Sequence, residues 1–302
     1  MIIISQILNR LLNRTSKERK NLMPDIAYVN GKFVRLSSAK ISIEDRGYQF
    51  GDGIYEVIKS YNGKIFYLEE HLNRLLRSAK AIELDIGYPI HKLRELVDIS
   101  FKKSKFQNAK IYLQITRGVA SRSHPFPKDV SPSIVITVRE IENIPEDLIN
   151  RGIDTITLPD IRWGRCDIKS LNLLPNVLAK QKAKERGAFE AIFVKDRIIT
   201  ESSASNIFAV IDNCLITHPK DNSILHGITR DIIIQLANDN HIRVVERKFI
   251  IEEMLKAEEV FITGTTIELL SVVKIDGLVI GKGKPGDIYK FFRLKFTDII
   301  ES

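Results

Sequence analysis

Two Asn-Gly pairs constrain the first part of this chain more than any other feature. Asn30-Gly31 and Asn62-Gly63 each lie between two strand-like runs. An Asn-Gly pair supplies the two positive φ angles of a type I′ turn, so each pair predicts a tight β-hairpin. The four runs are residues 27–29, 32–34, 55–61 and 64–67. We therefore expect antiparallel strands near the start of the chain.

Helices and further strands follow the second hairpin. Residues 69–82 repeat apolar side chains at helical spacing, and Pro89 stands at the first turn of a second helical segment, where proline is tolerated. Two strand-like runs come next, at residues 110–116 and 133–138. A boundary is expected near Asn143-Ile144-Pro145. Residues 25–144 are thus predicted to form a small α/β domain.

The second half contains many short strands and few helices. Strand-like runs occur at 154–158, 191–194, 198–199, 206–211, 214–217 and 260–263. Helices are expected over 171–186, which Gly187 would end, and over 229–237 and 286–300. This pattern predicts a larger, barrel-like domain over residues 145–302. The fold class is therefore α/β (α+β), with two domains.

Composition excludes several classes of protein. The chain has 302 residues, of which 44% are apolar, and a formal net charge of +8. No basic tract interleaved with aromatics occurs after residue 24, so we expect no nucleic-acid partner. No apolar run approaches the length of a membrane span, so we expect no membrane partner. Cys166 and Cys214 are the only cysteines, which fits a reducing cytoplasm and predicts neither a disulfide framework nor a metal site.

Lys169 is the first candidate for chemistry. It lies between Ile168 and Ser170, after a strand-like run and before a predicted helix. Burial and cationic neighbours lower the pKa of a lysine amine and make it nucleophilic, and Arg162 and Arg165 lie just upstream. Most lysines, however, are solvated surface residues.

Glu201 gives Lys169 a possible partner. Pyridoxal phosphate requires a lysine for its Schiff base and an acidic group at its ring nitrogen. Lys169 and Glu201 could supply both. A surface lysine and an ordinary turn glutamate remain the alternative at this point.

An anion site is predicted where residues 225–229 run into a helix. The free N–H groups at a helix N-terminus suit a phosphate. The Thr229 hydroxyl could cap the helix or bind the anion, and the two roles are compatible. The run Thr263-Gly264-Thr265-Thr266 offers a second turn rich in hydroxyls.

Four segments in order resemble the D-amino acid aminotransferases of the fold type IV pyridoxal phosphate enzymes. They are residues 44–56, 115–118, 165–174 and 225–230. The resemblance runs from about Ala27 to near the C-terminus. It implies a small α/β domain and a larger pseudo-barrel domain, with pyridoxal 5′-phosphate between them.

The resemblance also assigns roles to residues. It implies that Lys169 is the Schiff-base lysine and proton carrier and that Glu201 is the ring partner. The other implied cofactor ligands are Arg74, Ser205, Ile228, Thr229 and Thr265, with Arg162 a weaker candidate near the phosphate. Tyr55, Arg122 and His124 would bind the substrate carboxylate, with the loop of one subunit entering the site of the other. A homodimer is therefore expected.

The implied reaction converts D-alanine and 2-oxoglutarate to pyruvate and D-glutamate. An L-branched-chain aminotransferase and an aminodeoxychorismate lyase share the fold, but Arg122-Ser123-His124 favours the D-specific enzyme. A non-catalytic pyridoxal phosphate-binding protein is disfavoured because the implied site residues are intact. Ala204 and Gly264 stand where relatives usually have serine, which affects fine tuning of the cofactor ring.

The first 24 residues are basic and carry apolar residues at helical spacing. Such a segment could be a transit peptide. We favour a dispensable extension, since the resemblance begins only after Met23-Pro24, which makes Met23 a candidate start.

Overall fold

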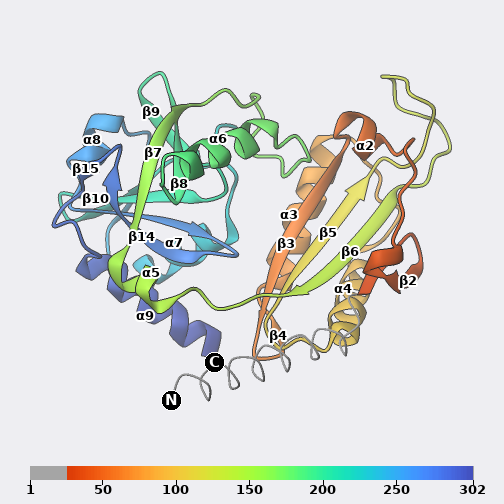
Figure 1. The fold of residues 1–302 in the computed structure, drawn as a ribbon, viewed down its shortest axis with the longest axis horizontal. Helices are drawn as coiled ribbons and strands as arrows, with labels where there is room; N and C mark the ends of the chain where they lie inside the picture. The colour runs from red at the N-terminus through yellow and green to blue at the C-terminus, as the bar shows by residue number, and fades with distance from the viewer. Residues whose placement is uncertain (1–25, 302) are drawn as a thin grey trace, which may run out of the picture.

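The computed structural model describes residues 26–301, so the basic extension predicted for residues 1–24 lies outside the described part. Two sheets lie side by side and are joined by the segment that leads from β6 (Ser133–Glu140) to α5 (Glu146–Arg151) (Figure 1). Each sheet carries its own helices. The result is a two-domain α/β fold, as the sequence predicts.

The first sheet has six strands in the order β2-β1-β6-β5-β3-β4, and all of its pairs are antiparallel. The remaining strands are β1 (Ile26–Val29), β2 (Lys32–Arg35), β3 (Gly53–Tyr61), β4 (Lys64–Ile65) and β5 (Ala109–Thr116). Asn30 and Gly31 have φ angles of 44° and 92°, and Asn62 and Gly63 have φ angles of 49° and 82°. Both Asn-Gly pairs therefore form the predicted hairpin turns.

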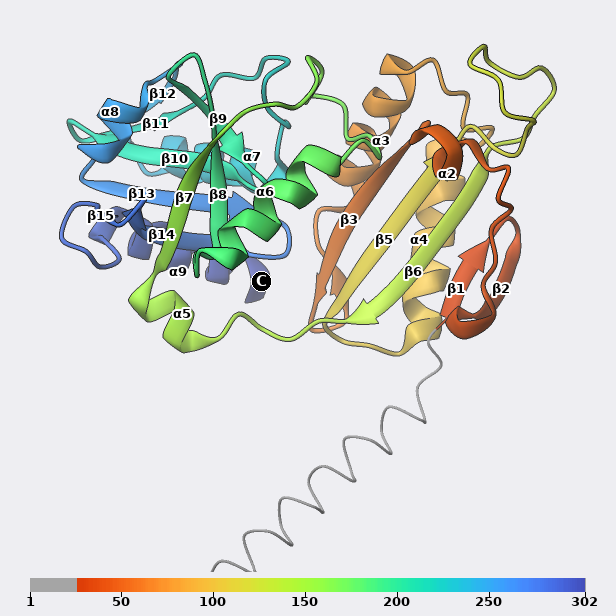
Figure 2. The ribbon, with the colours of Figure 1, turned by 45° about the horizontal axis from the view of Figure 1, so that its top comes forward.

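Two helices, α3 (Leu68–Ala81) and α4 (Ile90–Ser104), cover one face of this sheet (Figure 2). Leu72 of α3 and Leu93 of α4 are fully buried against the sheet. Successive strand side chains point to opposite faces. On β3, Ile54 and Ile58 face these helices, so Tyr55 and Val57 face away from them, toward the second domain.

The second sheet has nine strands, in the order β12-β11-β10-β13-β14-β7-β8-β9, with β15 paired to β14. They are β7 (Ile153–Pro159), β8 (Glu190–Lys195), β9 (Ile198–Ser202), β10 (Asn206–Ile211), β11 (Cys214–Thr217), β12 (Val244–Glu246), β13 (Glu259–Gly264), β14 (Glu268–Ile275) and β15 (Leu278–Val279). Strand β9 ends this order, yet only the residues 203–205 connect it to β10, near the other end, and Ser202 N donates to Ser205 O over 2.7 Å within that connection. The sheet thus bends round on itself as a pseudo-barrel.

The helices of this half are α6 (Leu174–Glu185), α7 (Ile228–Asp239), α8 (Ile251–Leu255) and α9 (Asp287–Glu301). Ile233 of α7 and Phe292 of α9 pack with Phe208 and Phe261 on one side of the sheet. The short helices η1 (Leu36–Ser38) and α2 (Arg46–Phe50) belong to the first half. None of the helices within residues 26–301 is long and apolar enough to cross a membrane.

The buried apolar side chains gather separately in the two halves. The cluster of the first domain draws its buried members from residues 28–138, with Ile168 as the one addition from the second half. The buried members of the other three clusters lie within residues 153–296. Ile168 therefore ties the segment around Lys169 to the first domain.

Two expectations about elements need correction. The helix after Lys169 begins at Leu174 rather than Leu171, because Leu171 N donates instead to Gly53 O of β3 over 3.1 Å. Strand β14 was not predicted, although it lies next to β7 and β13 near the middle of the second sheet.

Candidate active site

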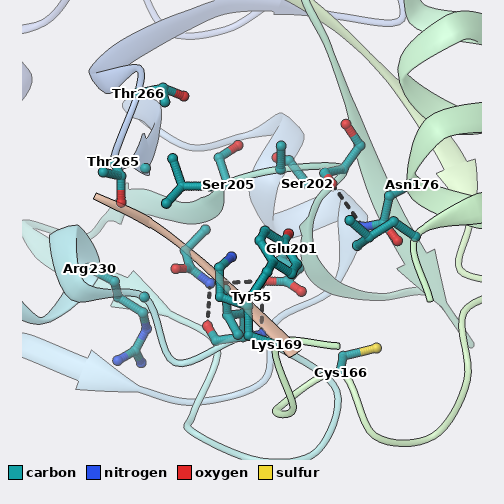
Figure 3. Close-up of a pocket in the computed structure, with 18 of the residues that line it drawn as sticks. Tyr55, Cys166, Lys169, Asn176, Glu201, Ser202, Ser205, Arg230, Thr265 and Thr266 are labelled. Carbon is teal, nitrogen blue, oxygen red and sulfur yellow. Dashed lines mark hydrogen bonds between the residues drawn. The ribbon is translucent and has the colours of Figure 1, made fainter. Parts of the chain in front are cut away.

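A cavity of about 450 Å³ lies between the two domains. Strand β3, the segment 162–180, the residues between β9 and β10, the N-terminus of α7 and the turn after β13 all line it. Figure 3 shows Tyr55, Lys169, Glu201, Ser205 and Thr265 gathered round this space. The side chains from both domains therefore meet at one site.

The backbone around Lys169 is bound to strand β3. Tyr55 N donates to Lys169 O over 3.0 Å, and Leu171 N donates to Gly53 O. Ser78 Oγ of α3 accepts from Lys169 N at 3.2 Å. A Cβ at Gly53 would lie 2.7 Å from Ile115 O of β5 and 2.9 Å from Leu171 Cδ1, so glycine is needed where β3 meets both neighbours. The half-buried Lys169 amine is held 4.4 Å from the centroid of the Tyr55 ring.

Glu201 is buried and receives hydrogen bonds from three donors. Asn206 Nδ2 and Leu225 N donate to Oε2 over 2.9 and 3.0 Å. Arg162 Nη1 donates to Oε1 over 2.5 Å. Burial raises the pKa of Glu201 to about 7, although the Arg162 charge and the donated hydrogen bonds act in the opposite direction. The carboxyl group therefore changes its charge near neutral pH.

Arg162 supports Glu201 rather than the phosphate region. Its guanidinium also pairs with Asp160 over 2.7 Å and lies 4.5 Å from the centroid of the Phe193 ring. The sequence suggested Arg162 only as a weaker phosphate candidate. Its spacing two residues after Asp160 is the signal that could have revealed the pairing.

The N-terminus of α7 opens into the cavity. Gly227 is its N-cap, so no side chain caps the first helical N–H groups. Ile228 and Thr229 follow and line the cavity together with Thr265 from the turn after β13. A Cβ at Gly227 would lie 2.0 Å from Asn206 Oδ1, which excludes any other residue without rearrangement. Free N–H groups and hydroxyls in one place suit a phosphate.

Arg74 of α3 also lines the cavity and is itself held by Glu56. Its Nε and Nη2 donate to the two Glu56 oxygens, each over 2.7 Å. Its Nη1 donates to His226 O over 3.0 Å, next to the N-cap of α7. Burial alone would raise the pKa of Glu56, but the Arg74 charge and the hydrogen bonds with Arg74 and His71 hold it well below its ordinary range. Arg74 thus fixes the turn before α7.

The residues present fit pyridoxal phosphate. The buried hydroxyls of Ser202, Ser205 and Thr263 line the cavity and have no hydrogen-bond partner in the protein. Buried hydroxyls are normally satisfied, so unpaired ones facing a cavity indicate a polar ligand. An amine, a carboxyl group and an uncapped helix end stand around the same space, which matches the three functional parts of this cofactor.

Arg122 and His124 do not line this cavity. They lie in the exposed loop between β5 and β6. Arg122 donates to Gln49 O over 3.2 Å and packs on the Phe50 ring, and Arg46 donates to the carbonyl oxygens of Ser123 and His124. The single chain therefore brings together Tyr55 and the expected cofactor ligands but leaves these two residues apart.

Residues 53–275 match the family model for amino-transferase class IV. The chain belongs to the class IV aminotransferase family. Membership confirms the aminotransferase activity and the pyridoxal phosphate cofactor that the resemblance implies. Among residues 26–301, this aminotransferase contains no group of three or more side chains that could hold a metal ion.

Curated relatives of this class IV aminotransferase include D-alanine aminotransferases. The one from Staphylococcus haemolyticus is 44% identical over 275 residues, which cover 91% of this chain and 98% of that protein. The one from Bacillus licheniformis is 44% identical and covers 86% of this chain and 92% of that protein.

The solved structures that resemble it include branched-chain amino acid aminotransferases. The structure from Escherichia coli has a TM-score of 0.84 at 28% identity and covers 92% of this chain and 94% of that chain. The structure from Thermoproteus uzoniensis, with norvaline, has a TM-score of 0.82 at 26% identity and covers 92% of this chain and 95% of that chain. Another of these branched-chain enzymes was solved with pyridoxamine 5′-phosphate. These neighbours confirm the fold type IV architecture.

Proposed function

We propose that this protein transfers amino groups between D-amino acids and 2-keto acids, converting D-alanine and 2-oxoglutarate to pyruvate and D-glutamate. The observation that carries the proposal is the placement of the Lys169 amine and the Glu201 carboxyl group at one cavity. The choice of D-amino acids is supported by relatives named D-alanine aminotransferase at 44–45% identity.

Each site residue has a distinct task in this proposal. Lys169 would hold the cofactor's aldehyde carbon, Glu201 would keep a proton at its ring nitrogen, and the α7 N-terminus with Thr229 and Thr265 would bind its phosphate. When bound, pyridoxal phosphate supplies an electron sink for the electron pair left at the substrate α-carbon. The Lys169 amine, once released, takes the α-proton and later returns it as an acid.

Arg74 contributes indirectly to phosphate binding. It fixes the His226-Gly227 turn and adds a positive charge to the region. Ile228 offers its backbone N–H at the first helical position of α7, and Ser205 offers its unpaired hydroxyl.

We further propose that a second copy completes the site. Arg122 and His124 lie outside the cavity of their own chain, on an exposed loop that a neighbouring subunit could receive. With Tyr55 they would bind the substrate carboxylate in a cytoplasmic homodimer.

We also propose that the two domains divide near residue 144.

A branched-chain activity is the second candidate, because the resembling solved structures named above carry that name. Their identity of 26–28% is far below that of the D-alanine enzymes, so we rank it lower.

Substrate handedness is tested by single half-reactions. Cofactor-loaded protein is mixed with D-alanine or with L-leucine, without keto acid, and the cofactor absorbance and keto acid formed are recorded. We expect stoichiometric pyruvate from D-alanine and no change with L-leucine. The reverse result would move the protein to the branched-chain class.

Lys169→Ala should lower turnover by roughly a thousandfold, because one amine serves as both attachment point and base.

A further inference from the structure

Six cationic side chains line the cavity: Arg74, Lys110, Arg162, Lys169, Lys180 and Arg230. Four of them are paired with carboxylates. Arg74 pairs with Glu56, and Arg162 pairs with Asp160 and Glu201. The other two pairs are Lys180 with Glu190 and Arg230 with Glu246. Within residues 26–301, Lys169 and Lys110 are left without a carboxylate partner. The proposed function uses Lys169 but not Lys110.

Lys110 lies on the cavity face of the first sheet. It is on β5, where Gln114 pairs with Tyr55 and Tyr112 pairs with Val57 in the register with β3. Residues directly opposite in a sheet share a face. Lys110 therefore projects on the same side as Tyr55, two pairs further along the strands. Its side chain is exposed to the cavity mouth.

The cross-strand neighbours of Lys110 are also cationic. Lys59 stands opposite it on β3 and Arg139 stands opposite it on β6. Glu268 neutralises the buried Lys59 at 2.5 Å, but no carboxylate within the described residues pairs with Lys110 or Arg139. Like charges directly opposite one another repel. An anion brought in at Lys110 would relieve this repulsion.

We propose that Lys110 binds the distal carboxylate of a dicarboxylic substrate, namely that of D-glutamate or 2-oxoglutarate. The inference rests on the proposed function and assigns the residue that accepts the acidic partner of the reaction. An ammonium group at the mouth suits a second carboxylate, since the phosphate region already has α7, Thr229 and Arg74. A substrate such as D-alanine has no group that reaches Lys110.

Binding is measured first, so that the test does not depend on turnover. Trp163 is the only tryptophan and lines the cavity, so its fluorescence reports ligands there. The holoenzyme is titrated with glutarate and with pentanoate, which has the same chain length but one carboxylate. We expect the wild type to bind glutarate about tenfold more tightly than pentanoate, and Lys110→Met to lose this preference. Lys110→Arg should keep it.

Kinetic measurements then test whether Lys110 affects only the binding of dicarboxylic substrates or also the reaction itself. Lys110→Met should lower kcat/KM for D-glutamate about tenfold and leave the D-alanine half-reaction unchanged. An equal loss for both substrates would assign Lys110 to the phosphate or the α-carboxylate and overturn the proposal. Unchanged glutarate binding in Lys110→Met would overturn it as well. If the wild type fails to react with D-alanine, the proposed function fails, whereas the glutarate comparison still decides the role of Lys110.

Discussion

Glu201 accepts hydrogen bonds from three donors within a buried environment. The donors favour the ionised carboxylate, and burial favours the neutral acid. Burial is the larger effect, so the pKa of Glu201 rises to about 7, and the Arg162 charge and the donated hydrogen bonds keep the rise from being larger. In the proposed function Glu201 would share a proton with the ring nitrogen of the cofactor. A carboxyl group with a pKa of about 7 suits that role.

This balance predicts how the cofactor-free protein responds to pH. The pKa of Glu201 is raised in the folded state, so the folded protein retains a proton that the unfolded chain releases between about pH 4.5 and 7. Stability from this group is present at low pH and is lost as the pH rises through about 7. The Glu201→Gln side chain cannot titrate. The melting temperature of this variant should therefore rise relative to that of the wild type between pH 5 and pH 8. If the melting temperatures of the two proteins changed with pH in parallel, the raised pKa of Glu201 would be contradicted.

The sequence proposed residues for the site but did not show which side chains hold them in place. Lys169, Glu201, Thr229 and Thr265 do line one cavity, as the motifs predict. Arg162 could not be assigned to Glu201 from the sequence, because they are 39 positions apart and meet only through the fold. Local motifs can suggest which residues line a cavity, whereas ion pairs between distant segments require the tertiary structure.

The turn between β13 and β14 depends on Glu268. This residue pairs with Gly264 across the turn and has a φ of 51°, where a side chain is strained. Lys59 and Arg293 lie 2.5 and 2.7 Å from its carboxylate, and the Tyr61 hydroxyl donates to it over 2.9 Å. The turn that carries Thr265 and Thr266 is thus anchored to β3 and α9 at once.

Substitutions at Glu268 should distinguish the free-energy cost of its positive φ from the stabilisation that its pairing with Lys59 provides. Glu268→Gly removes a strain of about 1–2 kcal/mol but leaves Lys59 buried without a partner, which costs roughly 3–5 kcal/mol. We expect a net loss of about 1–4 kcal/mol of unfolding free energy, measured by urea denaturation. In a Lys59→Met background the same change should be nearly neutral. Additive effects of the two substitutions would show that the pair is not coupled.

Strand β14 was missed for the same reason that makes Glu268 unusual. The two hairpins that the sequence did predict carry Asn-Gly at their turns, where positive φ angles are expected. The run Thr263–Thr266 does signal a turn, but the positive φ belongs to Glu268, a residue that does not mark a hairpin, so the strand that begins there was not recognised. The side-chain partners of Glu268 lie in β3 and α9, far away in the sequence, and they compensate for a locally unfavourable residue.

The two domains contribute unequally to the complete site. Of the residues that line the cavity, the second domain supplies Lys169, Glu201 and the N-terminus of α7, and the first supplies Tyr55, Arg74 and Lys110. The Arg122-Ser123-His124 loop belongs to the first domain but is turned away from its own cavity, held by Arg46 and Phe50. If the loop acts on substrate, it must act in another copy or move.

Complementation distinguishes these two arrangements. Arg122→Ala and Lys169→Ala are each expected to be nearly inactive as pure proteins, since each removes one component from both sites of a dimer. When the two variants are co-expressed, half of the dimers are hybrids by random pairing. If Arg122 serves the partner's site, every hybrid has one site with both residues intact, and activity should recover to about a quarter of the wild type. If Arg122 serves its own chain, no hybrid has an intact site and the mixture stays inactive. Size-exclusion chromatography of the mixture confirms that dimers are present.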